Sequence, residues 1–283
     1  MNKVNSVSSI HQSELLTHCE AQMIALVSHD QPALFHLKSG GSRTRAKICI
    51  NAGVHLNLEP LDIINLACTV ELLHNASLIH DDVQDNDIQR RGRPSVWKKF
   101  GKSSAICSGD AMLSAAYSTL ADISNPNLIG KLLLETHKSV SETITGQSRD
   151  LCSSDASTVA EYESIAAMKS GPLFRLGLML PIILAGQTKY KAKIYYITSK
   201  FATAYQINDD VYDWQQDKAS GQLNLVNILA SQCTNYDALI MAKDRARYLL
   251  KQCQKELALL PDNCASLVSQ HTEILLNELE SSY

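Results

Sequence analysis

The sequence lacks the features of several large protein classes. Its eight cysteines are scattered without a C-x-x-C pair, which argues against a cysteine-based metal site or redox motif. We expect these cysteines to be small core residues of a protein in a reducing compartment. No run of about 18 apolar residues occurs, and no basic region followed by an apolar core opens the chain. We therefore expect neither a transmembrane segment nor secretion, and we expect a cytoplasmic protein.

The chain also lacks strand alternation, a linker and a strong excess of charge. Its net charge is −3, and the basic residues are dispersed along the sequence without a stripe of aromatic and basic residues, which argues against a nucleic-acid partner. At 283 residues it exceeds the common domain size, but nothing in it resembles a linker. We expect one all-α domain over residues 1–283.

Helical spacing of apolar residues covers most of the sequence. Residues 86–102 are polar and contain Gly92 and Pro94, so we expect a loop there. Breaks are expected at Asp30 to Pro32, at Gly171-Pro172 and at Pro181. The expected helices are 10–28, 43–57, 61–79, 104–123, 127–151, 158–185, 191–215, 235–260 and 264–280.

An acidic group follows the third of these apolar stretches. Asp81, Asp82 and Asp85 form a D-D-x-x-D motif, and in a helix Asp81 and Asp85 lie one turn apart on one face. Carboxylates held this close repel each other unless a cation lies between them, and oxygen ligands of this kind suit Mg²⁺ with a substrate phosphate. An isolated acidic cluster is often only a solvated helix end, so this motif alone leaves both interpretations open.

The same pattern returns at Asp209, Asp210 and Asp213, again after an apolar helical stretch and close to the polar Gln206. One such motif is expected by chance in roughly a few per cent of chains of this length, and two in far fewer. The pair predicts a magnesium-dependent site for a diphosphate.

Seven segments, in order, resemble motifs of the trans-polyprenyl diphosphate synthase family, over roughly residues 35 to 230. They are GGSRTR (40–45), ELLHNASLIHDDVQD (71–85), RRG (90–92), SGDAML (108–113), GQSRDL (146–151), MKSGPLF (168–174) and YQINDDVYD (205–213). The resemblance implies an all-α bundle around a deep central cavity (the class I isoprenoid synthase fold), usually as a homodimer. It also implies head-to-tail condensation of isopentenyl diphosphate with an allylic diphosphate.

The resemblance further implies a role for each matching residue. The six aspartates would hold Mg²⁺ from opposite walls of the cavity, and Arg90 and Lys169 would contact the allylic diphosphate. Isopentenyl diphosphate would be held by Arg45, His74 and Arg91, while Gln206 and Ser170 would face the reacting carbons.

The sequence departs from the family pattern at several positions. Ser42 replaces the usual lysine, Ala46 a proline, and Ser170 the common threonine. The basic loop after the second motif is shortened and keeps Lys218 as its nearby lysine, and ELESSY at the C-terminus lacks basic residues. We hypothesise that Arg43 supplies the charge of the missing lysine.

Small residues near the first motif bear on product length. Ala76 and Ser77 lie about one helical turn before Asp81, roughly 6–8 Å away, where short-chain members commonly have an aromatic residue. We predict a product of geranylgeranyl length or longer, with a cavity floor that includes Leu73, Met112 and Leu113.

Three other functions stay open. A class I terpene cyclase usually carries Ser or Thr and Glu in its second metal motif, whereas this chain has Asp213 and Asp217. A head-to-head prenyl synthase would not need the isopentenyl residues Arg45, His74 and Arg91. A non-catalytic or regulatory subunit of a prenyl synthase is compatible with the missing lysines, although the intact aspartates argue against it.

Overall fold

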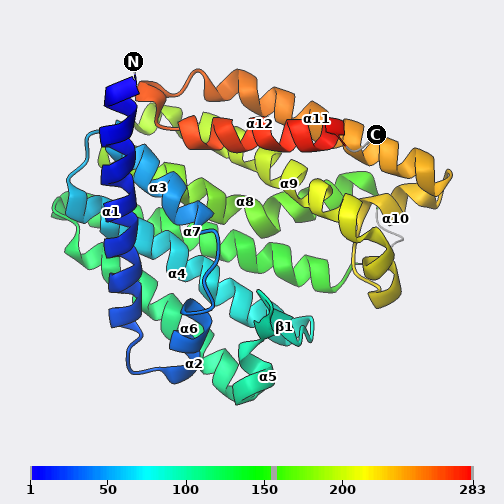
Figure 1. Ribbon diagram of the computed structural model, residues 1–283, viewed down its shortest axis with the longest axis horizontal. Coiled ribbons are helices and arrows are strands. Elements are labelled where there is room, and N and C mark those ends of the chain that lie inside the picture. Colours follow the sequence, from blue (N-terminus) through cyan, green and yellow to red (C-terminus); the bar gives the residue numbers. More distant parts are fainter. Residues whose placement is uncertain (1, 154–157, 282–283) are drawn as a thin grey trace. The chain divides into compact units, whose positions relative to one another are not determined.

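The computed structural model describes residues 2–153 and 158–281, with side chains described over 12–153 and 158–280. Over these ranges the regular structure is helical apart from one short hairpin, which confirms the all-α class (Figure 1). The elements are α1 (Asn2–Leu26), α2 (Gln31–Leu37), α3 (Thr44–His55), α4 (Pro60–Gln84), β1 (Gln89–Arg90), β2 (Arg93–Pro94), α5 (Val96–Phe100), α6 (Lys102–Ser118), η1 (Thr119–Asp122), α7 (Pro126–Leu151), α8 (Val159–Leu184), η2 (Thr188–Tyr190), α9 (Lys191–Ser220), α10 (Leu225–Ala230), α11 (Asn235–Leu257), η3 (Pro261–Asn263) and α12 (Ser266–Ser281).

Packing contacts divide the chain into two compact units. The first comprises Met1–Glu135 and Leu180–Gln187, and the second comprises Thr136–Met179 and Thr188–Tyr283. Organisation as a single domain over 1–283 stays a prediction, and the two units are described separately.

Helix α4 is the centre of the first unit, where it packs against α1, α3 and α6. It begins at Pro60, a residue favoured at the first helical position because its missing N–H would be unpaired there anyway. Most of its apolar side chains are buried, among them Leu66, Leu72 and Ile79. The helix therefore continues through the first two aspartates as far as Gln84.

The expected loop at 86–102 contains regular structure, so that expectation is partly wrong. Strands β1 and β2 pair antiparallel, with Arg90 opposite Arg93. The two residues that connect them, Arg91 and Gly92, both have positive φ (54° and 71°), as a tight type I′ turn requires. This turn places Arg91 at the tip of the hairpin, and the short helix α5 follows directly.

Asp30 does not simply interrupt the helices. Its carboxylate accepts a hydrogen bond from the backbone N–H of Ala33 at 2.9 Å, so it caps the start of α2. The expected break at 30–32 is therefore the start of a new short helix.

Helix α9 is the centre of the second unit and packs against α10, α11 and α12. Phe174 of α8 contacts Phe201 of α9 edge-to-face, with 5.2 Å between ring centroids. The expected breaks at Gly171-Pro172 and Pro181 are wrong, because α8 is continuous. Residues 171–183 are all buried, and this packing outweighs the cost of about 3 kcal/mol for proline inside a helix.

By length and composition alone α8 is also apolar enough to cross a membrane, but 72% of its most apolar 18-residue stretch is buried inside the fold. Core helices of globular proteins meet the same criterion. The absence of a transmembrane segment stays a prediction.

Candidate active site

The first acidic motif lies at the C-terminal end of α4, and its central member is fully buried. Asp82 is 0% exposed, and its Oδ1 accepts hydrogen bonds from Arg90 Nε at 2.8 Å and Nη2 at 2.5 Å. Its Oδ2 has no hydrogen-bond partner among the described residues. Burial raises the pKa of Asp82, while the bond from Arg90 opposes that rise. Asp81 and Asp85 are half-buried, which leaves them better placed than Asp82 to meet a ligand.

The hairpin directs its arginines to different partners. Arg90 contacts Asp82 and also Asp87, at 3.4 Å. Arg91 donates to the carbonyl oxygen of Gly40, and its guanidinium packs so closely on Gly41 that a Cβ there would lie 2.6 Å from Arg91 Cζ. Glycine at 41, with φ of 127°, is what permits this approach.

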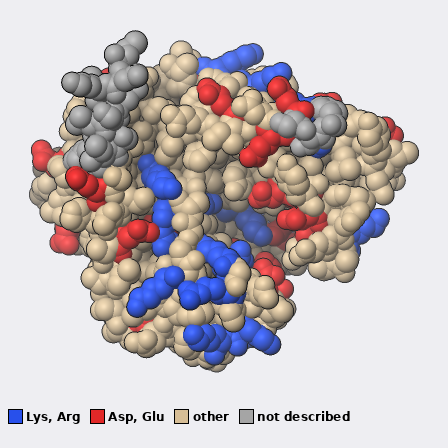
Figure 2. Space-filling view, viewed as in Figure 1, with Lys and Arg blue, Asp and Glu red and all other residues tan. Residues whose placement is uncertain are grey.

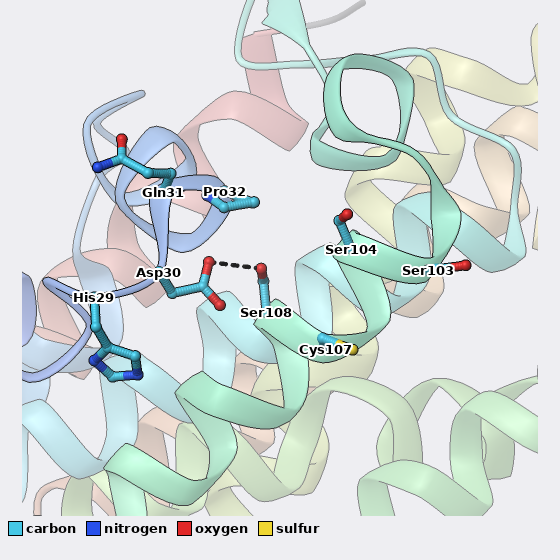
Figure 3. A pocket seen from close by; sticks show the side chains of 8 residues that line it. All are labelled: His29, Asp30, Gln31, Pro32, Ser103, Ser104, Cys107 and Ser108. Atoms are coloured by element: carbon cyan, nitrogen blue, oxygen red, sulfur yellow. Dashed lines mark hydrogen bonds between the residues drawn. The ribbon is translucent and has the colours of Figure 1, made fainter.

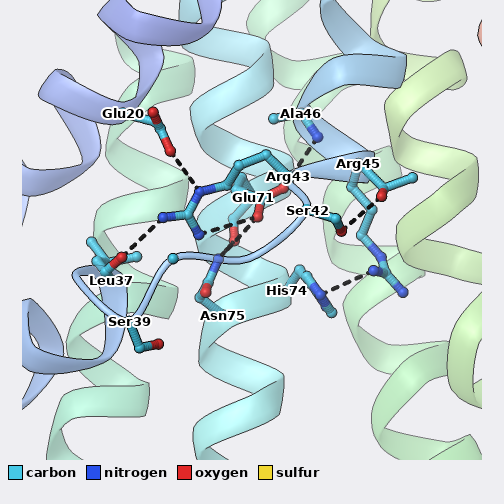
Figure 4. Close-up of polar contacts among 12 residues, drawn as sticks. Glu20, Leu37, Ser39, Ser42, Arg43, Arg45, Ala46, Glu71, His74 and Asn75 are labelled. Atoms are coloured by element: carbon cyan, nitrogen blue, oxygen red, sulfur yellow. Dashed lines mark hydrogen bonds and ion pairs between the residues drawn. The ribbon is translucent and has the colours of Figure 1, made fainter. Parts of the chain in front are cut away.

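Buried Glu71 of α4 organises the segment that contains GGSRTR (Figure 4). It is 1% exposed and accepts hydrogen bonds from the backbone N–H of Ala46 at 3.1 Å and from Asn75 Nδ2 at 3.2 Å. Asn75 Oδ1 in turn lies 3.1 Å from Nε2 of buried His36. Burial, followed by the charge of Arg91, lowers the pKa of His36 to about 3, so this histidine is neutral.

Arg43 belongs to the same network rather than to the surface. Its side chain is 6% exposed, donates to Glu20 Oε1 at 2.9 Å and to the carbonyl oxygen of Leu37 at 3.0 Å, and lies 3.6 Å from Glu71 Oε1. These contacts stabilise the first unit. The hypothesis that Arg43 replaces the missing lysine stays untested, and a diphosphate would have to compete with these internal acceptors.

Arg45 and His74, both predicted to bind isopentenyl diphosphate, form a pair. Arg45 Nη1 lies 3.0 Å from His74 Nε2, and since arginine only donates, Nε2 is the acceptor and the proton of this neutral ring is on Nδ1. Desolvation, followed by the charge of Arg45, lowers the pKa of His74 well below its ordinary value. Ser42, at the missing lysine position, shares a hydrogen bond of 2.8 Å with Thr44.

The second acidic motif lies within α9 and has a buried and an exposed part. Asp210 is 1% exposed and accepts hydrogen bonds from the backbone N–H of Leu225 at 2.7 Å and from Gln206 Nε2 at 3.1 Å. Asp209 and Asp213 are exposed. Burial raises the pKa of Asp210 to about 6, while desolvation, followed by the charges of Asp210 and Asp213, raises the pKa of Asp209 to about 7. The carboxylates of this motif therefore repel one another when they are ionised.

Asn224 ties the shortened loop to this motif and was not predicted from the sequence. Its Nδ2 donates to the carbonyl oxygen of Asp210 at 3.1 Å and to Asp217 Oδ2 at 2.8 Å. Its Oδ1 accepts from the backbone N–H of Val226 at 2.8 Å and so caps α10. The one sequence signal for it was a capping residue placed directly before an apolar run.

Lys169, predicted to contact the allylic diphosphate, is held by a residue that sequence reasoning also missed. Its Nζ lies 2.6 Å from Asp150 Oδ2. A Cβ at Gly146 would lie 2.5 Å from the backbone nitrogen of Lys169, so glycine allows α7 and α8 to approach here. Asp150 and Gly146 both lie in GQSRDL, so the motif contained the signal. Ser170 is half-buried.

The predicted floor residues lie on α4 and α6, two helices that pack together. Leu73, Ala76 and Met112 are buried, whereas Ser77 and Leu113 are partly exposed. Leu73, Ala76 and Met112 therefore belong to the closely packed part of the first unit, and the role of these residues as a cavity floor stays a prediction.

The donor chemistry of the two motifs fits Mg²⁺. No group of three His, Cys, Asp or Glu residues in the described part of the chain is arranged to hold a metal by itself. Magnesium rarely needs such a cage, since it usually takes one or two carboxylates and completes its shell with water and substrate phosphate. Asp81, Asp85, Asp209 and Asp213, which are partly or fully exposed, are suited to that role.

A separate open cavity of about 510 Å³ lies between the start of α2 and α6 (Figure 3). Across it, Ser108 Oγ donates to Asp30 Oδ1 at 2.8 Å. None of the predicted site residues lines this cavity. Its lining residues are His29, Asp30, Gln31, Pro32, Ser103, Ser104, Cys107 and Ser108.

Comparisons with known proteins identify relatives over most of the chain. Geranylgeranyl pyrophosphate synthase 11, chloroplastic, from Arabidopsis thaliana is 29% identical over 79% of this chain and 66% of its own length. A probable farnesyl diphosphate synthase from Sinorhizobium fredii is 33% identical over 72% of this chain and 63% of its own. The chain thus spans about half to two thirds of the length of the curated relatives it matches.

Solved structures with a similar fold include another prenyl diphosphate synthase. The solved structure of a geranylgeranyl pyrophosphate synthetase from the archaeon Geoglobus acetivorans matches with a TM-score of 0.84 and 23% identity, over 93% of this chain and 98% of that one. The polyprenyl synthetase family model matches residues 28–256. The chain therefore belongs to the polyprenyl synthetase family.

Proposed function

We propose that the protein is a trans-isoprenyl diphosphate synthase, which joins isopentenyl diphosphate head-to-tail to an allylic diphosphate in a magnesium-dependent reaction. The observation that carries the proposal is the charge of the second motif. Asp209 and Asp213 are exposed carboxylates on one face of α9, and like charges beside Asp209 help to raise its pKa. Exposed carboxylates that repel one another support the binding of Mg²⁺ together with a substrate diphosphate.

The chain's own residues would act on the two substrates in different ways. Arg90 and Lys169 would bind the allylic diphosphate, whose negative charge increases as its carbon–oxygen bond breaks. Arg45 and Arg91 would hold isopentenyl diphosphate through forked hydrogen bonds. The pairing with Arg45 leaves Nδ1–H of His74 as the donor for that second diphosphate. Gln206 and Ser170 would face the reacting carbons.

Bound magnesium would supply concentrated positive charge to the leaving diphosphate. Its ligands in this proposal are Asp81, Asp85, Asp209 and Asp213, with Asp82 and Asp210 as further candidates. Asp82 is bonded to Arg90, and Asp210 to Gln206 and Leu225, so these two would also position their neighbours.

Product length would be set by the small residues before the first motif. We propose a product of geranylgeranyl length or longer, because Ala76 and Ser77 are small where short-chain members of the family commonly have an aromatic residue. Replacing Ala76 by Phe should shorten the product. Because Ala76 is 2% exposed, thermal unfolding of the variant must first show that the fold survives the larger ring.

The decisive experiment supplies Mg²⁺, isopentenyl diphosphate and each allylic diphosphate in turn, and sizes the products by chromatography. Asp81→Asn and Asp209→Asn should each lower the rate at least about a hundredfold, since each removes a carboxylate that acts on the transition state. Asp244→Asn, at a carboxylate that is 63% exposed and paired with Arg247, is the matched control. Full activity in either motif variant would refute the proposal.

A second candidate is a non-catalytic or regulatory partner of another prenyl synthase. It is favoured by one observation, namely that Ser42 replaces a lysine while Nε and Nη2 of Arg43 donate to Glu20 and to the carbonyl oxygen of Leu37. No product with any allylic starter, together with stimulation of a catalytic synthase on mixing, would support this alternative. Cyclised hydrocarbon from an allylic diphosphate alone would instead indicate a terpene cyclase. A homodimer and a cytoplasmic location stay predictions.

A further inference from the structure

One surface of the first unit concentrates positive charge in a chain whose net charge is −3. Residues 88–109 contain six lysines and arginines and no aspartate or glutamate. Two of the six, Arg90 and Arg91, are engaged by Asp82 and Gly40. The exposed remainder, joined by one lysine from the end of α2, forms what we call the basic face: Lys38, Arg93, Lys98, Lys99 and Lys102.

The fold gathers these cations around two aromatic rings. Around Phe35, Lys99 Nζ lies 3.9 Å and Arg93 Cζ 5.6 Å from the ring centroid. Around Trp97, Lys102 Nζ lies 5.2 Å from the centroid. Figure 2 shows the result as blue side chains gathered in the lower part of the view, where Figure 1 has α2, α5 and β1.

The basic face also exposes apolar surface. Ile88 is 55% exposed at the entrance to the hairpin, and Pro94 is exposed at its exit. Cations lie over the rings of Phe35 and Trp97, which leaves less ring surface for stacking with nucleic-acid bases. The lysine side chains lie over aromatic rings, next to exposed aliphatic groups. This arrangement matches the surface of a lipid bilayer, which is charged at the headgroups and apolar beneath them.

We propose that the basic face docks the protein onto the surface of an anionic phospholipid bilayer, without insertion of a helix. Clusters of four to eight lysines and arginines are a recognised size for attraction to anionic lipid, and this face has five. The choice of a lipid surface over an acidic protein rests in part on the proposed function. A prenyl diphosphate of geranylgeranyl length or longer is an amphiphile whose tail is poorly soluble in water, and a docked enzyme would release it beside a bilayer.

Sedimentation with vesicles tests the proposal without any measurement of catalysis. Vesicles of phosphatidylglycerol and phosphatidylcholine, in a ratio of about one to three, should bind the wild-type protein, and vesicles of phosphatidylcholine alone should not. The triple variant Lys98→Glu, Lys99→Glu, Lys102→Glu should bind the anionic vesicles at least about tenfold more weakly. The milder Lys98→Gln, Lys99→Gln variant keeps most of each side chain over the rings and should lose roughly threefold.

The matched control reverses three exposed lysines of the second unit, Lys189, Lys251 and Lys255, and should bind within about twofold of wild type. Thermal unfolding midpoints confirm that the variants are folded.

An equal loss in this control, or no binding to anionic vesicles at low salt, would overturn the proposal. So would equally tight binding to soluble polyglutamate, which would indicate an acidic protein partner. Unchanged binding of the triple variant to the anionic vesicles would also overturn it. Because each readout is physical binding, an inactive enzyme that still docks would separate this inference from the proposed function.

Discussion

The network around Arg43 allows a quantitative prediction, since this one guanidinium bridges a buried and an exposed carboxylate. Glu71 is 1% exposed, whereas Glu20 is 42% exposed, and both lie within 3.6 Å of the Arg43 side chain. Removing one charge from a buried pair costs about 3–5 kcal/mol, but an exposed pair contributes at most about 1 kcal/mol. The two glutamates should therefore differ strongly when each is replaced by glutamine.

We expect Glu71→Gln to lower the free energy of unfolding by less than this full cost of about 3–5 kcal/mol. An amide oxygen can still accept from Ala46 N–H, and Arg43 keeps its bonds to Glu20 and the carbonyl oxygen of Leu37. We expect a loss of about 1–3 kcal/mol in the free energy of unfolding, which is on the order of 3–10 °C in Tm for a chain of this size. For Glu20→Gln we expect less than about 1 kcal/mol.

Urea unfolding followed by circular dichroism, with each variant compared to wild type at neutral pH, measures both losses. The segment that Glu71 anchors also carries Arg45, so Glu71→Gln should raise the KM for isopentenyl diphosphate more than that for the allylic substrate. If Glu20→Gln proves as destabilising as Glu71→Gln, the difference in burial is not what governs this network and the reasoning fails.

Three further predictions concern other close contacts. A Cβ at Gly109 would lie 2.3 Å from His80 Nε2, so Gly109→Ala should destabilise by about 1–3 kcal/mol in urea unfolding, and the added change His80→Ala should restore most of the loss. Asp150→Asn should raise the KM for the allylic diphosphate, because Lys169 loses the partner that positions its Nζ, and should lower the free energy of unfolding by about 1–2 kcal/mol, because the pair is only partly exposed. His36 is neutral in the folded protein, where its pKa is about 3, so its contribution to stability is present above pH 6.5 and is lost as the pH falls from 6.5 toward 3. In His36→Gln the free energy of unfolding, measured at a series of pH values, should therefore decline less over this range.

Local sequence signals predicted the acidic helices well. Regular apolar spacing located α4 and α9, and the second D-D-x-x-D group lies within α9. The helix expected at 61–79 is longer than predicted, because α4 continues through Asp81 and Asp82 to Gln84 and has Asp85 as its C-terminal cap. Both signals are short-range, because helical periodicity and a motif of five residues are complete within a few turns of the chain. Proline was the misleading local signal, since α8 is stabilised by neighbours that lie far away in the sequence.

Contacts between distant segments could not be predicted in the same way. Arg43 resembled a charge available to substrate, yet its bonds to Glu20 and Glu71 join residues 23 and 28 positions away. Four residues of the basic face, Arg93, Lys98, Lys99 and Lys102, are neighbours in the sequence. The contribution of α2 could not be predicted, because it depends on the packing of α2 against α5. Burial decides the role of each of these charges, and it arises from tertiary packing rather than from a motif.

The second acidic motif leads to a prediction about metal and pH. The folded protein raises the pKa of Asp210 to about 6 and that of Asp209 to about 7, above the ordinary 3.8. Each group therefore adds stability that is complete below about pH 4 and is lost as the pH rises through 6 to 7. A divalent cation binds the ionised carboxylates, so it competes with these protons at low pH and restores stability once they have left.

We therefore expect millimolar MgCl₂ to raise Tm by several degrees at about pH 8 and by much less at about pH 5.5, with the transition between them near pH 6 to 7. Asp209→Asn removes one of the two titrating groups and should reduce the magnesium effect at pH 8. Asp244→Asn, distant in sequence and exposed, should leave it intact. Inorganic diphosphate added with the metal should enlarge the stabilisation, because each completes the other's coordination. A magnesium shift of equal size at both pH values would show that the cation does not compete with protons at this motif, and the assignment of Asp209 and Asp210 to metal binding would then be wrong.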